Sequence, residues 1–408
     1  MRFLDELAAR RRFGMRPGLD AMRRMCRAMG DPQERVRAIH VAGTNGKGAV
    51  CAILDSCLRA VGCTVGRYTS PHLVSLNERF FIGGEPVSDD VLEASARRVA
   101  GIPESGSLTY FEALTAVAFD IYASAALDYV ILETGLGGRL DATNVCRPSL
   151  SVITRIGLDH CEWLGGTVRE IALEKAGIMR PSVPVVIGAN EGEALDVLRR
   201  HAGETMSRVV YAPDEVDEGE IPADFSLGGA FNRENAVTAL AALKTIGAET
   251  RAVAGMSSVV WPGRFQRVGR FIVDGAHNPP AARALAASLS EEIGGRPRRS
   301  CDLIAGFCGD KDVDEVLRTL SPLVRRGYAV KTNNPRSLAA PAVAAKMKDA
   351  GIDAVACDSL REAMETAGPV PVVICGSLFL AGEALVELGA YPWGRSPRYD
   401  PAESLRSS

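Results

Sequence analysis

The sequence lacks the features that mark membrane-spanning, secreted and nucleic-acid-binding proteins. No stretch reaches the roughly 18 uncharged apolar residues that a membrane span requires. The first residues, MRFLDELAARRR, include acidic side chains and no apolar signal core, so we expect a cytoplasmic protein that contacts no membrane. The 47 lysines and arginines are balanced by 50 acidic residues, which argues against a generally basic nucleic-acid binder.

Cysteine pairs at metal-binding or redox spacing are also missing. Ten cysteines occur in 408 residues, but no two stand in a C-x-x-C arrangement, so zinc ribbons and thioredoxin-type sites have no support. Several, including Cys51 and Cys57, fall inside apolar patterns, which indicates reduced thiols buried in a cytosolic protein. No repeat of solenoid length and no low-complexity tract is found.

Apolar runs of strand length alternate with helical patterns through both halves of the chain. The strand candidates are 36–42, 129–132, 151–153, 183–187, 271–273, 303–305, 329–331, 354–356 and 372–375, and helical patterns in the second half are 281–293, 313–325, 340–350 and 379–388. This alternation predicts an α/β fold with two parallel-sheet domains. We place the domains at residues 1–262 and 263–390, followed by a loose, proline-containing tail at 391–408.

The segment Gly43–Gly48 (GTNGKG) follows the first strand and precedes a helical pattern. Backbone N–H groups of a glycine-rich turn at a helix N-terminus bind phosphate, and Lys47 adds a positive charge. The segment is not a standard Walker A motif, because Val41 stands at its first glycine position and Gly48 at its Ser/Thr position. We interpret it as a phosphate-binding loop.

Several chemically active residues stand at or just after predicted strand ends, where open α/β sheets place ligands. They are His72, His160, His277 and Glu133. A carboxylate such as that of Glu133, beside a phosphate loop, is a natural ligand for Mg²⁺. Lys175 has apolar neighbours, and burial would make its amine neutral and nucleophilic. An exposed lysine paired with Glu174 or Glu170 fits the same spacing.

Eight motifs in one order give a more specific indication. They are GTNGKG (43–48), TSPHL (69–73), LTYFE (108–112), ILETGLGGRLDATN (131–144), GLDHCEWLG (157–165), EKAGI (174–178), PGRF (262–265) and DGAHNP (274–279), with weaker GDKD (309–312), NPRS (334–337) and ICGS (374–377). Together they resemble the folylpolyglutamate synthase/dihydrofolate synthase family, a branch of the Mur ligase superfamily. The resemblance implies an N-terminal P-loop-type ATP-binding parallel sheet and a smaller C-terminal Rossmann-like domain.

The activity that this resemblance implies is ATP-dependent addition of L-glutamate to dihydropteroate, to reduced folates, or to both. The γ-phosphoryl group of ATP passes to a substrate carboxylate, and the amine of glutamate then attacks the acyl phosphate. Phosphoryl transfer requires alignment and charge neutralisation, and the second step requires a dry site. The implied cofactors are ATP, two Mg²⁺ ions and a carbamate on Lys175, in a protein expected to be a monomer.

Matching the motifs residue by residue extends the candidate site. ATP contacts fall on Thr44, Asn45, Gly46, Lys47, Asn235, Arg264 and Asp274. Metal ligands fall on Ser70, Glu133, His160 and carbamylated Lys175, and His277 joins Lys47 and Lys175 as a catalytic candidate with a positioning role. Substrate contacts fall on Thr109, Tyr110, Phe111, Glu112, Leu140, Asp141 and Ala142. Phe111 can stack on a flat pterin, and Asp141 can accept hydrogen bonds from it.

One departure from the family pattern leaves alternatives open. Ala49 stands where the family usually has Ser or Thr, which removes a hydroxyl beside the phosphate loop. A catalytically dead ATP-binding homologue therefore remains an alternative, although Glu133, His160 and Lys175 argue against it. A Mur-type ligase for a peptidoglycan precursor is a second alternative, disfavoured because no obvious UDP-binding domain precedes residue 43.

Overall fold

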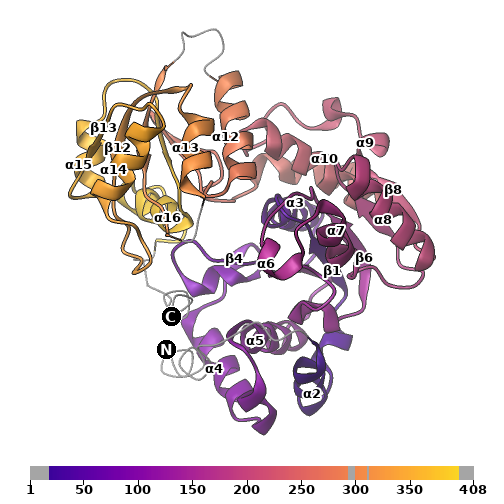
Figure 1. Ribbon diagram of the computed structural model, residues 1–408. Coiled ribbons are helices and arrows are strands. Elements are labelled where there is room, and N and C mark those ends of the chain that lie inside the picture. Colours follow the sequence, from indigo (N-terminus) through magenta and orange to yellow (C-terminus); the bar gives the residue numbers. More distant parts are fainter. Residues whose placement is uncertain (1–17, 293–298, 310–311, 395–408) are drawn as a thin grey trace.

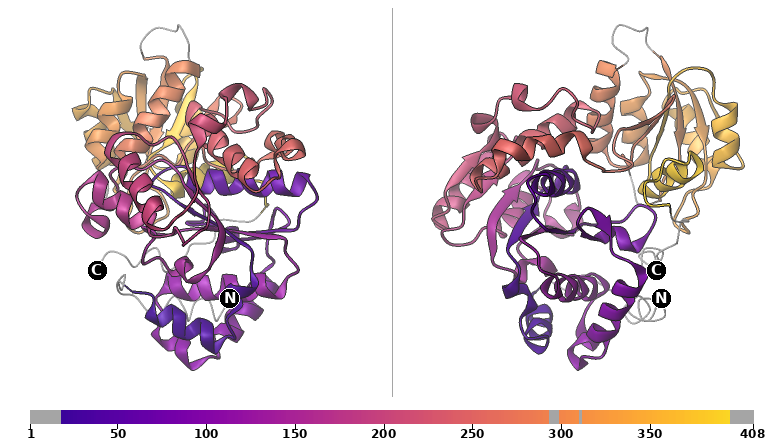
Figure 2. Two further views of the ribbon diagram at one scale, coloured as in Figure 1. Left: turned by 90° about the vertical axis from the view of Figure 1, so that its right-hand side faces the viewer. Right: turned by 180° about the vertical axis from the view of Figure 1, so that it is seen from behind.

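Two separate sheets organise the chain. The computed structural model describes residues 18–292, 299–309 and 312–394. An eight-stranded sheet occupies the N-terminal part and a six-stranded sheet the C-terminal part, and the two units lie side by side in Figure 1 and in the right-hand view of Figure 2. The predicted α/β fold with two parallel-rich sheets is therefore confirmed.

The N-terminal sheet has the strand order β4-β3-β2-β5-β1-β6-β7-β8. The strands are β1 (Ala38–Ala42), β2 (Val65–Tyr68), β3 (Phe80–Ile82), β4 (Glu85–Pro86), β5 (Tyr129–Glu133), β6 (Pro148–Ile153), β7 (Val185–Ile187) and β8 (Val209–Tyr211). In the run β2-β5-β1-β6-β7-β8 every strand is parallel to its neighbours, whereas β3 is antiparallel to both β2 and β4. The central β1 and β5 are buried at every residue, as expected for parallel strands covered on both faces.

Helices cover both faces of this sheet. They are α2 (Asp20–Ala28), α3 (Lys47–Ala60), α4 (Asp89–Ala100), α5 (Tyr110–Ser124), α6 (Cys161–Leu164), α7 (Val168–Ala176), α8 (Gly192–Glu204), α9 (Ala212–Glu215), α10 (Ala230–Thr245) and α11 (Glu249–Ala252). One apolar cluster includes residues of α3 and α10, and another includes residues of α2, α4 and α5. Helix α3 is buried from Gly48 to Leu58, which holds its N-terminal turn firmly at the glycine loop.

The C-terminal sheet has the order β13-β12-β11-β14-β10-β9, and only β9 is antiparallel to its neighbour. Its strands are β9 (Gln266–Val268), β10 (Phe271–Val273), β11 (Cys301–Ala305), β12 (Val324–Ala329), β13 (Ala354–Ala356) and β14 (Val372–Cys375). Its helices are α12 (Pro279–Glu292), α13 (Val313–Leu320), α14 (Ala340–Asp349), α15 (Leu360–Thr366) and α16 (Leu378–Glu387). Helix α12 lies beside α10, so the two units are in contact there (Figure 1).

Two predicted elements in the C-terminal part are wrong in their bounds. The helix expected over 313–325 ends at Leu320, and the strand expected at 329–331 is β12, which runs over Val324–Ala329. Two arginines and a glycine in β12 (VRRGYA) obscure its apolar pattern. The strands predicted at 271–273, 354–356 and 372–375 match β10, β13 and β14. Short polar or edge strands such as β4 and β9 were not predicted.

The expectation of a loose tail is wrong for its first residues. The Tyr391 hydroxyl donates a hydrogen bond of 2.6 Å to Glu78 Oε1, and the Trp393 ring lies 5.2 Å from the ring of Phe81. These aromatic side chains find apolar and hydrogen-bonding partners on the N-terminal unit, which the local sequence could not show. Residues 395–408 lie outside the described part, and the domain bounds proposed from the sequence stay a prediction.

All ten cysteines are free thiols; eight are buried, Cys63 is half-buried and Cys161 is exposed. Within residues 18–292, 299–309 and 312–394, no helix is both long enough and apolar enough to cross a bilayer.

Candidate active site

The carboxyl ends of three central strands bring the predicted site residues to one edge of the N-terminal sheet. Val41 pairs with Glu133 at the end of β5, and Ala42 pairs with Ile153 at the end of β6. The glycine loop leaves β1 at this edge and leads into α3. In open parallel sheets, the crevice outside such strand ends is where ligands bind.

The glycine loop is fixed by contacts with the segment that follows β6. Thr44 Oγ1 and the backbone of Gly157 exchange two hydrogen bonds of 3.0 Å, and Thr154 Oγ1 donates to Asn45 O at 2.7 Å. Gly46 has φ of +88°, a left-handed conformation that favours glycine. A side chain on Gly46 would collide with Asn235 Oδ1, so Asn235 of α10 lies directly against the loop.

Lys47 opens helix α3, and its ammonium Nζ donates to Thr44 O at 3.2 Å. The first N–H groups of this 14-residue helix have no partner within the helix, and the helix dipole adds positive potential at the same place. Loop, helix end and lysine together can hold the phosphates of a nucleotide.

Glu133 is a buried carboxylate with positive charges around it. Burial raises its pKa, whereas Lys47, the N–H of Ser70 and Arg264 act to lower it. Ser70 N–H donates to Glu133 Oε2 at 3.0 Å, so the structure brings these two predicted metal ligands together. A divalent cation would stabilise the ionised form that burial disfavours, and hydroxyl and carboxylate oxygens are ligands that Mg²⁺ prefers. Both residues therefore fit a magnesium site.

His160 occupies a more exposed position. It directly precedes α6, with φ of +51°, and its Nε2 lies 3.9 Å from Asp159 Oδ2. No group of three or more His, Cys, Asp or Glu side chains among the described residues is arranged to hold a metal unaided. Mg²⁺ commonly keeps several waters and binds through one or two carboxylates and substrate phosphates. Sharing of one ion by Ser70, Glu133 and His160 stays a prediction.

Lys175 of α7 is buried, with only 4% of its surface exposed. Its Nζ donates to Gly43 O at 2.8 Å, at the start of the phosphate loop. Desolvation, and next the positive charge of Lys47, lower the pKa of Lys175 to about 7. The alternative of an exposed lysine paired with Glu174 is wrong, because Glu174 instead pairs with Arg139 at 2.7 Å.

Glu170, the other partner considered for Lys175, is also engaged elsewhere. Its carboxylate accepts hydrogen bonds from Thr167 at the start of α7 and completes a capping box there. Lys175 is thus directed to the phosphate loop and away from the helix surface.

The C-terminal unit contributes Arg264 and Asp274 to the same region. Asp274 accepts backbone hydrogen bonds of 2.7 Å from Phe265 and Ala276. Burial lowers the pKa of Arg264, while the charges of Asp274 and Glu133 raise it. Arg264 therefore interacts electrostatically with one carboxylate from each unit. His277 Nδ1 lies 2.7 Å from Gly275 O in the same segment.

Two of the predicted substrate residues have a helix-capping role. Thr109 N–H donates to Glu112 Oε2 at 2.7 Å, and Glu112 N–H donates to Thr109 Oγ1 at 3.3 Å. This capping box begins α5 and orients Phe111 in its first turn. The Phe111 ring covers Gly135, where an added Cβ would come within 2.5 Å of it.

Asp141 is a buried carboxylate whose oxygens are already used by the chain. Oδ2 accepts hydrogen bonds of 2.8 Å from the N–H groups of Gly135 and Leu136. Oδ1 accepts from Thr143 N–H at 3.0 Å and from its hydroxyl at 2.5 Å. Asp141 thus shapes the loop that Phe111 covers. Tyr110 and Leu140 are half-buried and Ala142 is buried. Contact of any of these residues with a pterin stays a prediction.

Sequence reasoning missed Trp261 and Arg67. The Trp261 ring packs on Gly48, where a Cβ would lie 2.2 Å from it. The Arg67 side chain is buried; its guanidinium carbon lies 3.9 Å from the centre of the Phe81 ring, and its Nε lies 3.4 Å from Asp55 Oδ2. The charge of Arg67 also acts on Glu133. An arginine in the apolar run VGRY, directly before the TSPHL motif, was the available signal.

Comparison with known proteins agrees with this geometry. The family model described as Mur ligase, glutamate ligase domain, matches residues 263–377. The dihydrofolate synthase/folylpolyglutamate synthase of Bacillus subtilis (strain 168) is 34% identical over 364 residues, covering 80% of this chain and 84% of the relative. The Escherichia coli (strain K12) protein of the same name is 35% identical over 371 residues, covering 86% of each.

Solved structures of similar proteins extend the match to the whole fold. Folylpolyglutamate synthase of Mycobacterium tuberculosis complexed with ADP and AMPPCP aligns with a TM-score of 0.83 at 30% identity, covering 94% of this chain and 97% of the other. E. coli FolC in complex with DHPP and ADP gives 0.81 at 31% identity, with 95% and 97% coverage. A bifunctional folylpolyglutamate synthase/dihydrofolate synthase with Mn, AMPPNP and L-glutamate bound gives 0.79 at 32%, with 92% and 95% coverage.

Proposed function

The chain belongs to the dihydrofolate synthase/folylpolyglutamate synthase family, and from this premise we propose an ATP-dependent ligase that adds L-glutamate to dihydropteroate, reduced folates, or both. The observation that carries the proposal is the meeting of Lys47, Glu133 and Lys175 around one glycine loop, with Arg264 reaching them from the C-terminal unit. The matched relatives span both activities, and a bifunctional enzyme is our proposal.

The nucleotide phosphates bind at residues 43–48 in this proposal. Lys47 and the first turn of α3 stabilise the charge that spreads over the transferred phosphoryl group. Asn235, Arg264 and Asp274 contact the remainder of the nucleotide, so ATP lies between the two units. Ser70, Glu133 and His160 would hold Mg²⁺, which neutralises phosphate charge when bound.

Lys175 carries a carbamate in our proposal. Its neutral amine attacks CO₂, forming an N–C bond and releasing one proton, and the product is an anion able to hold a second Mg²⁺. A pKa of about 7 leaves a substantial neutral fraction near pH 7, and the buried amine already lies against the loop at Gly43. The related structure with Mn and AMPPNP bound supports use of a divalent metal.

The acceptor substrate lies beside the 135–141 loop. Phe111 offers a ring face for a pterin, and the loop shaped by Asp141 forms the neighbouring wall. Glutamate arrives from the C-terminal unit, the part matched by the glutamate ligase domain model, and His277 positions groups near the phosphate end. Exclusion of water here protects the acyl phosphate from hydrolysis. A cytoplasmic monomer remains part of the proposal.

Phosphate release tests the proposed reaction directly. We expect release with ATP, Mg²⁺ and L-glutamate when either dihydropteroate or tetrahydrofolate is added, and background rates when glutamate is omitted. Activity with only one acceptor would contradict bifunctionality. No glutamate-dependent release with either acceptor would contradict the ligase and revive the two alternatives, a peptidoglycan-precursor ligase or an inactive ATP-binding homologue.

The residue after the lysine and glycine of the loop offers a smaller test. Ala49 is buried in the first turn of α3, at the position where the family resemblance implies Ser or Thr. Ala49→Ser restores one hydrogen-bonding group beside the phosphates, and we expect the KM for ATP to fall about threefold to tenfold. Steady-state kinetics at saturating acceptor and glutamate check this. An unchanged or higher KM would show that the hydroxyl has no role at this loop.

A further inference from the structure

Glu78 is a buried carboxylate on which two parts of the chain converge. It lies in the 3₁₀ turn Leu76–Arg79 and is 7% exposed. Its oxygens accept hydrogen bonds from the N–H groups of Leu73 (2.8 Å), Val74 (2.7 Å) and Ser75 (2.6 Å), and from the hydroxyl of Tyr391 (2.6 Å). Three donors come from one loop of the N-terminal unit and the fourth from the segment after α16.

The loop held by Glu78 begins at the metal side of the candidate site. β2 ends at Tyr68 and is followed by Thr69 and Ser70, and Ser70 donates its N–H to Glu133. Thr69 closes the loop at its base, because its N–H donates to Arg79 O and its hydroxyl to Glu78 O. A shift of this loop would therefore move Ser70 relative to Glu133.

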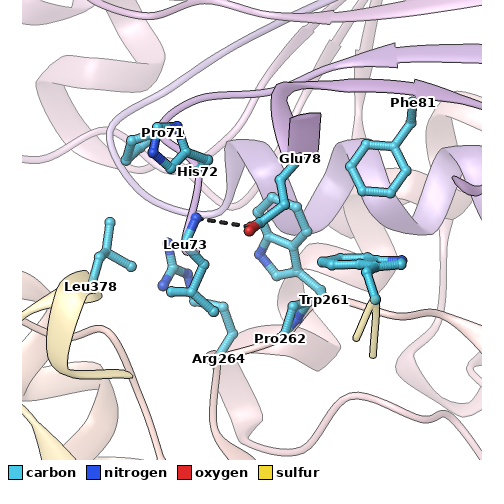
Figure 3. Close-up of a pocket in the computed structure, with 10 residues that line it drawn as sticks. Pro71, His72, Leu73, Glu78, Phe81, Trp261, Pro262, Arg264 and Leu378 are labelled. Atoms are coloured by element: carbon cyan, nitrogen blue, oxygen red, sulfur yellow. Dashed lines mark hydrogen bonds between the residues drawn. The ribbon is translucent and has the colours of Figure 1, made fainter. Parts of the chain in front are cut away.

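The tip of this loop packs into the C-terminal unit. Val74 is buried within an apolar cluster of that unit that includes Leu380 and Leu385 of α16. The backbone of Leu73 lies so close to Gly382 that a Cβ on the glycine would come within 2.6 Å of Leu73 O. Figure 3 shows Leu73 and Glu78, joined by their hydrogen bond, beside a cavity of about 20 Å³ that Arg264 and Leu378 also line.

We propose that Glu78 and Tyr391 are positioning residues that hold the 69–79 loop, and through it the predicted metal ligand Ser70, in register with the C-terminal unit. This inference rests on the proposed function. An ionised carboxylate accepts all four hydrogen bonds, and such charge-assisted bonds are stronger than those between neutral groups. Burial raises the pKa of Glu78, while the Tyr391 hydroxyl, first among the hydrogen-bond donors, acts to keep it ionised.

Tyr391→Phe removes only the hydroxyl and is the principal test. The probe is Mn²⁺ in the presence of AMPPNP, with free Mn²⁺ followed by electron paramagnetic resonance, so the measurement does not depend on turnover. We expect the apparent Kd for Mn²⁺ to rise about threefold to tenfold, the effect of losing one hydrogen bond to a charged group that is only partly transmitted to Ser70.

Tyr328→Phe is the matched control. Tyr328 is also buried in the C-terminal unit, and its hydroxyl donates to Thr366 O at 3.3 Å, away from the 69–79 loop. Both variants lose one tyrosine hydrogen bond and should lower the unfolding temperature, Tyr391→Phe by more because its partner is a carboxylate, but only Tyr391→Phe should weaken Mn²⁺ binding. If both variants weakened Mn²⁺ binding equally, the Tyr391 contact would contribute only to general stability, and the inference would be overturned.

Glu78→Gln is the second variant. An amide NH₂ cannot accept the N–H donors of the loop, so we expect a larger rise in the Mn²⁺ Kd than for Tyr391→Phe. Suppose that the wild-type enzyme turns over and that Tyr391→Phe binds Mn²⁺ as tightly as wild type does. This result would overturn the positioning inference and leave the proposed function intact. Failure of wild type to release phosphate overturns the proposed function, and the Mn²⁺ comparison still decides whether Tyr391 positions the loop.

Discussion

Lys47→Ala lowers kcat of the proposed ligase by about a hundredfold to a thousandfold, with a smaller change in the KM for ATP. The ammonium of Lys47 lies at the loop that receives the phosphates, and its charge is most valuable when negative charge spreads over the transferred group. Removing an interaction that is strongest in the transition state lowers kcat more than it weakens ground-state binding.

Phosphate-release kinetics with saturating acceptor check this expectation. Lys348→Ala, at an exposed position in α14, serves as the control for loss of one positive charge and should retain wild-type kinetics. A near-normal kcat for Lys47→Ala would mean that the phosphate site is elsewhere. A lower kcat in both variants would point to a general effect of net charge.

Lys175→Ala is the second variant with a large expected effect. Removing the side chain that carries the proposed carbamate should lower activity by about a hundredfold, as expected when support for a metal is lost. A small carboxylic acid such as acetate or formate can occupy the vacated space and supply an anion, so added acid should restore part of the rate. Rescue at millimolar acid, measured by phosphate release, distinguishes a missing anion from a damaged fold.

Two companion variants separate the carbamate from the positive charge. Lys175→Arg keeps a cation but cannot form a carbamate, and we expect it to be as inactive as Lys175→Ala. Glu174→Gln removes the neighbouring ion pair with Arg139, more than half of whose side chain is exposed, and should leave the rate nearly unchanged. An active Lys175→Arg enzyme would exclude the carbamate.

Activity should also depend on pH through Lys175. Its pKa of about 7 in the folded protein means that roughly half of the amines are neutral at pH 7 and roughly a tenth at pH 6. Only the neutral amine combines with CO₂, so carbamate is lost as pH falls through 7. We expect added bicarbonate to raise the rate of CO₂-depleted enzyme, more strongly at pH 8 than at pH 6. A bicarbonate response independent of pH would contradict this assignment.

The sequence predicted the site most reliably where chemistry and strand ends coincide. The glycine loop, Glu133 and the segment after β6 were all expected at strand ends, and the register of β1 with β5 and β6 brings them together. Lys175 shows the limit of such reasoning. Its spacing suited either a buried amine or a surface ion pair, and only the packing of α7 against the Gly43 loop decides between them.

Residues that act through tertiary contacts could not be predicted. Asp141 was expected to face a pterin, yet four hydrogen bonds from its own loop engage the carboxylate, and these partners depend on how the loop folds. The contacts of Arg67 are with Asp55 of α3 and Phe81 of β3, so they depend on how these elements pack together. Tyr391 finds Glu78 more than 300 residues earlier in the chain.

The burial of Val74 among side chains of the C-terminal unit limits which C-terminal units of relatives could replace this one. A hybrid that joined residues up to 262 of this chain to the C-terminal unit of a relative would need a foreign helix surface that accepts Val74 at the position of Leu380 and Leu385. Natural or laboratory recombination at the linker should therefore yield functional hybrids mainly when the 69–79 segment is transferred together with the C-terminal unit that surrounds its tip.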